Sequence, residues 1–295
     1  MVHGSTEQSR AGALRGTSQQ GVRPGAAGEP ARSYAHGEFP AADLVRLKEE
    51  AGSPVVSVCI PARDEEATVG VIVASVLDNL TASRSEAGLV DELLVVDDCS
   101  TDATAQVASS AGARVVSTGN RRGGKGEAMG VALEAAAGDL IVFLDADVES
   151  FGPHFVTGLL GPLLSEAGIA LVKGFYDRPL AGVEGEGGRV TELVARPLIN
   201  LLFPDLSWVL QPLAGETAAP RSVLEKLTLA GGYGVELGLL LDVCDRFGLE
   251  SIAQVDLGLR VHRNRPLADL RHQAEEVIQV ALERAGLVAR TPPER

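Results

Sequence analysis

Apolar and polar positions alternate regularly along the chain from Pro54 to about residue 144. Residues 55–60 form an apolar run bounded by prolines, which is typical of a buried parallel strand. The stretch that follows has its apolar residues three or four positions apart, on one stripe of a helix. That stripe consists of Val69, Ile72, Val73, Val76 and Leu80. The pattern therefore predicts a strand followed by an amphipathic helix.

The same alternation of short apolar runs and amphipathic stretches continues along the chain. It predicts strands over residues 93–96, 114–116 and 140–144, and helices over residues 101–110 and 127–136. Strands that alternate with helices in this way predict an α/β fold with a doubly wound, mostly parallel sheet.

The periodicity weakens after Asp147 and is absent from the N-terminal segment. We expect a loop-rich stretch that includes residues 182–188, and then helices over 190–202, 235–247 and 270–282. Residues 1–38 are rich in Gly, Ser, Ala, Gln and Arg and have no apolar period. Such a composition buries too little apolar surface to offset the entropy lost on ordering, so we predict a disordered tail there.

Composition narrows the functional classes. The formal net charge of -14 argues against nucleic acid or an anionic membrane as a partner, because both attract excess Lys and Arg. No apolar run of about 18 residues predicts a membrane span, and no apolar core of a signal peptide stands near the N-terminus. The three cysteines, Cys59, Cys99 and Cys244, are too scattered for a disulfide framework, and we interpret them as small core residues. We therefore expect a cytoplasmic protein.

Acidic and polar residues follow the predicted strands, at the sheet edge where doubly wound folds bind ligands. They are residues 61–65, Asp97 with Asp98, and Asp145 with Asp147. The two carboxylates of Asp145-Ala146-Asp147 leave room for a divalent cation, and hard oxygen ligands suit Mg²⁺ or Mn²⁺. An Asp-x-Asp triplet also arises by chance in acidic proteins. Its position after a buried strand favours the metal site.

Two glycine-containing segments could bind anions. Residues 120–126 form a basic loop before a helix, whose free N–H groups favour phosphate, and Lys125 would contact a diphosphate. The loop lacks the Walker spacing and the G-x-G-x-x-G pattern, so neither an NTPase nor a dehydrogenase is indicated. Residues 187–191 combine a glycine pair with Arg189 and Thr191 at a predicted helix start. A linker followed by a helix cap remains an equal alternative for that segment.

Two further residues have ordinary structural explanations when taken alone. A single histidine such as His262 is more often structural than a metal ligand. Glu236 opens an apolar helix, where a carboxylate is common.

Several motifs together resemble those of a known enzyme class. The segments 58–66, 95–102, 125–128 and 145–147 resemble the nucleotide-sugar half of GT-A glycosyltransferases. The segments 188–193, 233–236 and 262–264 are similar to those of the 3-phosphoglycerate glycosyltransferases of family 81, over about residues 54–282. The resemblance implies a GT-A fold and a metal-dependent hexosyltransferase. It also implies a nucleotide-sugar-binding half over 39–150, an acceptor-binding half over 151–295, and a homodimer.

The resemblance also implies roles for individual residues. The donor nucleotide and diphosphate would be bound by Pro61, Ala62, Arg63, Asp64, Glu65, Asp98, Lys125, Asp145 and Ala146, with Tyr233 and Glu236 near the transferred sugar. The metal, Mg²⁺ or Mn²⁺, would be held by Asp147 and His262. The catalytic group would be Asp147, Glu236 and His262. The acceptor, 3-phosphoglycerate, would be held by Gly188, Arg189, Val190, Thr191 and Asn264.

The same resemblance implies transfer with retention of anomeric configuration. No carboxylate is required as a covalent nucleophile, so we expect displacement on one face of the sugar, with the donor's own phosphate oxygen as base. Arg63-Asp64 stands where many members have Leu-Asn, and Cys99 where Gly is common. UDP-glucose is the expected donor, and GDP-mannose stays open as the alternative. A non-catalytic nucleotide-sugar sensor is a third possibility, although the acceptor residues are retained.

Overall fold

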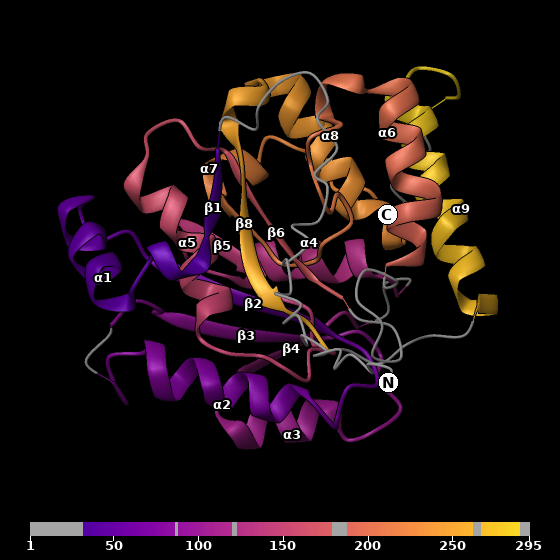
Figure 1. Cartoon of the computed structure of the whole chain (residues 1–295). Coiled ribbons are helices and arrows are strands. Elements are labelled where there is room, and N and C mark those ends of the chain that lie inside the picture. Colours follow the sequence, from indigo (N-terminus) through magenta and orange to yellow (C-terminus); the bar gives the residue numbers. More distant parts are fainter. Residues whose placement is uncertain (1–31, 86–87, 120–122, 179–187, 262–266, 290–295) are drawn as a thin grey trace, which may run out of the picture.

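One eight-stranded sheet forms the centre of the computed structural model, which describes residues 32–85, 88–119, 123–178, 188–261 and 267–289. The strand order is β1-β8-β6-β7-β5-β2-β3-β4, and only β7 runs antiparallel to its neighbours. Helices cover both faces of the sheet (Figure 1). The prediction of an α/β fold with a mostly parallel sheet is confirmed.

The first half of the sheet closely follows the apolar pattern of the sequence. Its strands and helices are β2 (Val56–Ala62), α2 (Val69–Leu80), β3 (Glu92–Asp97), α3 (Thr104–Ala111), β4 (Arg114–Ser117), α4 (Lys125–Ala135) and β5 (Leu140–Phe143). Each predicted strand is present, with each end within two residues of the prediction. These strands run parallel to one another, so their carboxyl ends lie at the same edge of the sheet.

The second half contains regular elements where the sequence suggested only loops. They are α5 (His154–Ser165), β6 (Leu171–Asp177), β7 (Thr217–Pro220), α7 (Arg221–Leu224) and β8 (Ile252–Leu259). The predicted helices are found as a π-helical turn, η2 (Thr191–Ala195), that continues into α6 (Arg196–Leu202), as α8 (Val235–Phe247) and as α9 (Leu267–Arg284). Short 3-10 turns are η3 (Pro204–Leu206), η4 (Gly232–Gly234) and η5 (Leu249–Ser251).

The N-terminal prediction was wrong at its boundary. Ser33–Ala35 forms strand β1, which pairs in parallel with β8, and His36–Glu38 forms a 3-10 turn, η1, before helix α1 (Ala41–Glu50). Phe39 packs into the core beside α5, against Gly161. Residues 32–38 therefore belong to the folded unit, because backbone pairing to a sheet edge orders them despite their polar composition. Residues 1–31 lie outside the described part.

The hydrophobic core has two layers, one on each face of the sheet. Alternate residues of one strand point to opposite layers, so Val58 and Ile60 join the layer of α1, α2 and α5, whereas Cys59 joins the layer of α4, α6 and α8. Figure 1 shows α2 and α3 on one side of the sheet and α4 and α8 on the other. No helix among the described residues is long and apolar enough to cross a membrane.

The cysteines do not all lie in the core. Cys59 is fully buried, and burial raises the pKa of its thiol to about 12. Cys244 is half-buried, and Cys99 is exposed, so the prediction of a core position was wrong for Cys99. Cys99 lies just after β3 with φ of 57°, in the left-handed region, and its thiol contacts the Thr118 hydroxyl and the Gly119 carbonyl at 3.6 Å.

Candidate functional site

A cavity of about 370 Å³ opens at the carboxyl ends of β2, β3 and β5 and extends to α8 and α9. Nearly all the site residues that the sequence singled out line it together. They are Pro61, Ala62, Arg63, Glu65, Asp98, Lys125, Asp145, Ala146, Asp147, Gly188, Arg189, Val190, Thr191, Tyr233 and Glu236. Asp64 does not line the cavity, and His262 and Asn264 lie outside the described residues.

The centre of the cavity is an ion-pair cluster around the Asp-Ala-Asp turn after β5. Lys125, the first residue of α4, donates from Nζ to Asp145 Oδ1 at 2.5 Å and pairs with Glu236 Oε1 at 2.5 Å. Gly215 must lack a side chain, because a Cβ there would collide with Asp145 and Lys125. Burial lowers the pKa of Lys125, but Asp145 and Glu236 outweigh it and hold that pKa above its ordinary value. The lysine is therefore a fixed positive charge.

Arg260, the residue directly after β8, joins both aspartates from the other side. Its Nη2 atom donates to Asp145 Oδ2 and to Asp147 Oδ1, each at 2.7 Å. Burial raises the pKa of Asp145, but Lys125 and then Arg260 outweigh it, so that pKa lies below its ordinary range. Asp145 thus remains ionised and is a weak base.

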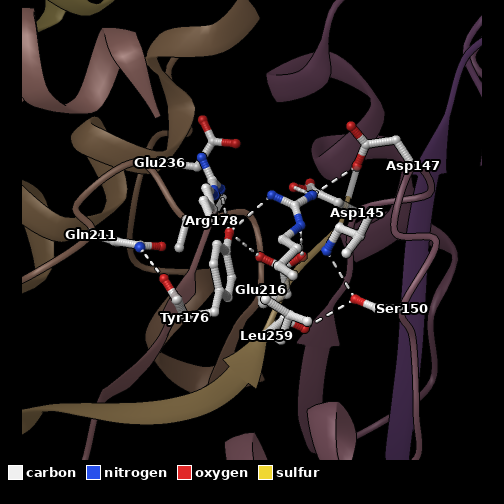
Figure 2. Close-up of polar contacts among 12 residues, drawn as sticks. Asp145, Asp147, Ser150, Tyr176, Arg178, Gln211, Glu216, Glu236 and Leu259 are labelled. Carbon is white, nitrogen blue, oxygen red and sulfur yellow. Dashed lines mark hydrogen bonds and ion pairs between the residues drawn. The ribbon is translucent and has the colours of Figure 1, made fainter. Parts of the chain in front are cut away.

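Tyr176 of β6 and Glu216, the residue before β7, are buried next to each other (Figure 2), and both contact Arg260. Glu216 Oε1 lies 3.3 Å from Arg260 Nε, and Tyr176 donates its hydroxyl proton to Glu216 Oε2 at 2.7 Å. Arg260 Nη1 donates to the Tyr176 hydroxyl at 3.0 Å, and Arg178 donates to the same oxygen. Both guanidinium groups also lie over the Tyr176 ring, 4.6 Å (Arg178) and 5.0 Å (Arg260) from its centroid.

One side of the cavity is built by the turns after β2 and β3. Asp98 is buried, accepts a hydrogen bond from Thr118 at 3.1 Å and lies 3.7 Å from Arg63. Burial raises the pKa of the Asp98 carboxyl. Asp64 instead turns its carboxylate to Thr101, accepting from its backbone N–H at 2.7 Å and from its hydroxyl at 3.0 Å. Asp64 therefore shapes the turn, while Arg63 and Asp98 face the cavity.

Another side of the cavity is formed by the start of η2 and by α9. Gly188 has φ of 73°, a conformation that glycine adopts without strain, and it places Arg189 and Thr191 at the cavity wall. Helix α9 faces them with His272, Gln273 and Glu276. Backbone N–H groups, a guanidinium and a hydroxyl are thus gathered where an anion can bind.

The carboxylate oxygens at the Asp-Ala-Asp turn are suitable ligands for a divalent cation. Asp147 uses Oδ1 for Arg260, while its side chain is 23% exposed toward the cavity. Carboxylate oxygens of this kind suit Mg²⁺ and Mn²⁺. Within the described residues no three His, Cys, Asp or Glu side chains gather as a metal site, and the predicted second ligand, His262, is outside them.

The sequence did not single out the residues that contact one another around Tyr176 and Arg260. Tyr176, Arg178, Glu216 and Arg260 come from segments without a recognised motif. The one usable signal is that Arg260 shares the basic stretch around His262. Leu213, Leu270 and Val277 add apolar wall to the cavity and were likewise not predicted.

The known proteins that this chain resembles are glycosyltransferases. A family model described as "Glycosyl transferase family 2" matches residues 57–181. The chain is 47% identical over 291 residues to a glucosyl-3-phosphoglycerate synthase of Mycolicibacterium paratuberculosis, covering 94% of this chain and 85% of the relative.

Solved structures agree with the sequence relatives. Glucosyl-3-phosphoglycerate synthase from Mycobacterium tuberculosis, in complex with Mn²⁺, UDP-glucose and phosphoglyceric acid, matches with a TM-score of 0.78 at 46% identity, covering 88% of this chain and 89% of that one. The same enzyme with Mg²⁺ and UDP matches with a TM-score of 0.79 at 45% identity, over 87% of each chain.

Proposed function

Because this chain belongs to the glucosyl-3-phosphoglycerate synthase family, we propose that it transfers glucose from UDP-glucose to 3-phosphoglycerate with retention at the anomeric carbon. The observation that carries the proposal is one cavity that brings the donor-type and acceptor-type residues together. Arg63 and Asp98 lie on one side of it, Arg189 and Thr191 on the other, and Lys125, Asp145 and Arg260 between them. One ligand-sized site therefore serves both substrates.

The donor is proposed to lie along the strand ends. Pro61, Ala62, Arg63, Glu65 and Asp98 bind the nucleoside, and Lys125 neutralises diphosphate charge. Ala146, together with Asp145, lies beside the ribose and phosphate, and Tyr233 and Glu236 contact the sugar. Asp64 acts indirectly, since its hydrogen bonds to Thr101 hold the turn that carries Arg63.

The acceptor is proposed to bind between η2 and α9. Backbone N–H groups of Gly188, Arg189 and Val190, the Arg189 guanidinium and the Thr191 hydroxyl are suited to its phosphate and carboxylate. Asn264 completes the site in this proposal. Thr191 is buried, so its side chain is held in place before the acceptor arrives.

Displacement on one face of the sugar is favoured by the state of the cavity's carboxylates. Asp145 pairs with Lys125 and Arg260, Glu236 with Lys125, and Asp147 with Arg260. A carboxylate whose charge is shared with a neighbouring cation is a weaker nucleophile than a free one. The protein instead orients the substrates and stabilises developing charge, while a donor phosphate oxygen accepts the proton of the acceptor hydroxyl.

Asp147 and His262 are proposed to hold Mg²⁺ or Mn²⁺. A bound cation of this charge neutralises the diphosphate as the glycosidic bond breaks. Lys125 and Arg260 keep Asp145 ionised, and Arg260 holds the Asp147 carboxylate in position, so the carboxylate oxygens are in place for that ion.

The test is product formation. Purified protein with Mn²⁺ and 3-phosphoglycerate would be given UDP-glucose or GDP-mannose in separate reactions, and the glycosyl-phosphoglycerate detected by mass spectrometry, with its anomeric configuration read by NMR. UDP-glucose should give an α-linked product and GDP-mannose none. Asp147→Ala is the inactive control, and Glu225→Gln, which changes an exposed ion pair with Arg221, is the matched active one.

Other results would select the alternatives. Product from GDP-mannose alone would make the protein a mannosyltransferase. Binding of both nucleotides without product from either would favour a nucleotide-sugar sensor and would refute the acceptor assignment to Arg189, Thr191 and Asn264.

We further propose a cytoplasmic homodimer. Leu193 on η2 and Leu201 on α6 are large apolar side chains that are 74% and 80% exposed, and an interface would cover them. Light scattering of the purified protein tests the dimer, and Leu201→Lys should shift it toward the monomer. A monomeric wild type at micromolar concentration would refute it.

A further inference from the structure

Glu216 is a buried carboxylate close to the cavity, but it does not line the cavity. Its side chain is fully buried and does not line the cavity, so it cannot touch either substrate directly. An isolated carboxylate in such a place is strongly unfavourable unless it is paired. Burial raises the pKa of Glu216 and Arg260 opposes that shift, so the carboxylate depends on the guanidinium for its charge.

The contacts of Glu216 converge on one group. Its Oε1 faces Arg260 Nε at 3.3 Å, and its Oε2 accepts from the Tyr176 hydroxyl at 2.7 Å. That hydroxyl in turn accepts from Arg260 Nη1 at 3.0 Å. Glu216 therefore contacts the guanidinium on two sides: directly through an ion pair at Nε that is not a hydrogen bond, and indirectly through the Tyr176 hydroxyl. Only Nη2 is left to face the cavity, where it holds Asp145 and Asp147.

We propose that Glu216 is a positioning residue, which acts on the reaction only by orienting Arg260 against the two aspartates of the Asp-Ala-Asp turn. This inference rests on the proposed function for its kinetic readout. A guanidinium is a rigid plane, so the ion pair at Nε together with the hydrogen bond from Nη1 to Tyr176 sets where Nη2 points. Without Glu216, the guanidinium would keep its charge and lose its direction.

The position of Glu216 in the chain explains how it is held. Gly215, the residue before Glu216, passes close to Asp145 and Lys125. Glu216 itself lies just before strand β7, which begins at Thr217. Its backbone carbonyl accepts from Gly174 of β6 at 2.8 Å. The segment that holds Glu216 thus also passes beside Asp145. A shift of this segment would move Glu216 and disturb Asp145 together.

A double-mutant cycle separates positioning from general stability. The four proteins are the wild type, Glu216→Gln, Arg260→Met and the double variant. Glu216→Gln keeps the side-chain volume and should lower kcat by about 10- to 100-fold, with the KM for 3-phosphoglycerate changed less than about threefold. In the Arg260→Met background the same substitution should change kcat by less than about threefold, because its target is gone.

Mn²⁺ affinity gives a second readout that needs no turnover. Electron paramagnetic resonance of free Mn²⁺ should show an affinity about tenfold weaker in Glu216→Gln and less than about threefold changed between Arg260→Met and the double variant. Glu283→Gln is the matched control, because Glu283 is also buried and lies beside Arg284, away from the cavity. It should leave kcat and Mn²⁺ affinity as in the wild type.

Each outcome decides. Wild-type kcat and Mn²⁺ affinity in Glu216→Gln, or an equal loss with and without Arg260, would overturn the proposal. If Glu216→Gln does not fold, Glu216→Asp, which keeps the charge on a shorter side chain, replaces it in the same cycle. A wild type that makes no product refutes the proposed function instead, and the Mn²⁺ cycle still decides the role of Glu216.

Discussion

The two halves of the sheet place their charged residues in different ways. In the first half, charged residues stand only at the ends of the strands and the middle of each strand is apolar, and the cavity residues Asp98 and Asp147 follow β3 and β5. In the second half, charges lie within or next to the strands. Lys173 and Tyr176 are inside β6, and Glu216 directly precedes β7. The first half thus supplies groups that can reach a ligand, and the second supplies buried groups that hold them.

Charged residues at the cavity and charged residues in the core differ in how many partners they need. Asp147 keeps part of its side chain open to the cavity and needs only Arg260 as a partner. Lys173 is fully buried and donates to the backbone carbonyl of Ala214 at 2.6 Å, and Glu216 is equally buried. Buried charges survive only with partners. Removing a first-half charge should therefore affect activity, and removing a second-half charge should also affect folding.

The largest expected effect is on activity. Asp147→Asn removes the carboxylate and keeps the shape, and it should lower kcat/KM by about 100- to 1,000-fold, because a charge is lost where the diphosphate departs. The free energy of unfolding should change by less than about 1 kcal/mol, since the site is partly solvated. Steady-state kinetics and urea unfolding measure the two. A loss of stability above about 2 kcal/mol would place Asp147 with the buried group and break the comparison.

The next effect is on stability. Arg260→Met leaves Glu216 and Asp145 without their shared cation and should lower the free energy of unfolding by about 3–5 kcal/mol. Urea unfolding at pH 7 measures it. Arg46→Met, which breaks an exposed ion pair with Glu50, is the control and should cost less than about 1 kcal/mol. Equal losses in the two variants would show that burial does not distinguish these pairs.

This contrast also explains what the sequence could predict. The apolar pattern of the sequence predicted β2, β3, β4 and β5 with their ends nearly correct. It also drew attention to the acidic residues that directly follow β3 and β5. β6, β7 and β8 carry Lys173, Thr217 and Gln254 on positions that look polar, so no apolar strand pattern appears. Their polarity is balanced by partners far away in the chain, such as Arg260 for Asp145. Pairing over such distances leaves no local period.

The site shows the same division. Arg189 and Thr191 were found because they stand in a recognised motif, whereas Glu216 and Tyr176 were missed because their function depends on contacts with Arg260. The tail boundary failed for a related reason. β1 is ordered by backbone pairing to β8, and that pairing is independent of the side-chain composition that suggested disorder.

A pH-dependent effect sharpens the comparison further. Burial lowers the pKa of Lys173 from its ordinary value of 10.5 to about 8, although Glu236 opposes the shift. Below pH 8 Lys173 is charged in the folded protein, and its burial lowers the free energy of unfolding by the full amount. Between pH 8 and about 10.5 the folded protein has released the proton that the unfolded chain still binds, so the penalty is relieved as pH rises.

The measurement is the difference in free energy of unfolding between the wild type and Lys173→Met. This difference should shift in favour of the wild type by up to about 3 kcal/mol from pH 8 to pH 10.5, because each pKa unit corresponds to about 1.4 kcal/mol. Urea unfolding at several pH values gives it. A difference that stays constant over this range would mean that Lys173 keeps its proton and is paired like Lys125.

The smallest effect is expected at Cys99, in the first half. Its φ of 57° disfavours a side chain by about 1 kcal/mol, so Cys99→Gly relieves strain in the folded state. Glycine also makes the unfolded chain more flexible, which opposes the gain by about 0.4–1 kcal/mol. The net change in stability should stay within about 0.5 kcal/mol by calorimetry. Because Cys99 is exposed and does not line the cavity, the KM for UDP-glucose should change less than about threefold. A tenfold change would show that this turn contacts the donor, and that first-half residues beyond the cavity wall also set donor preference.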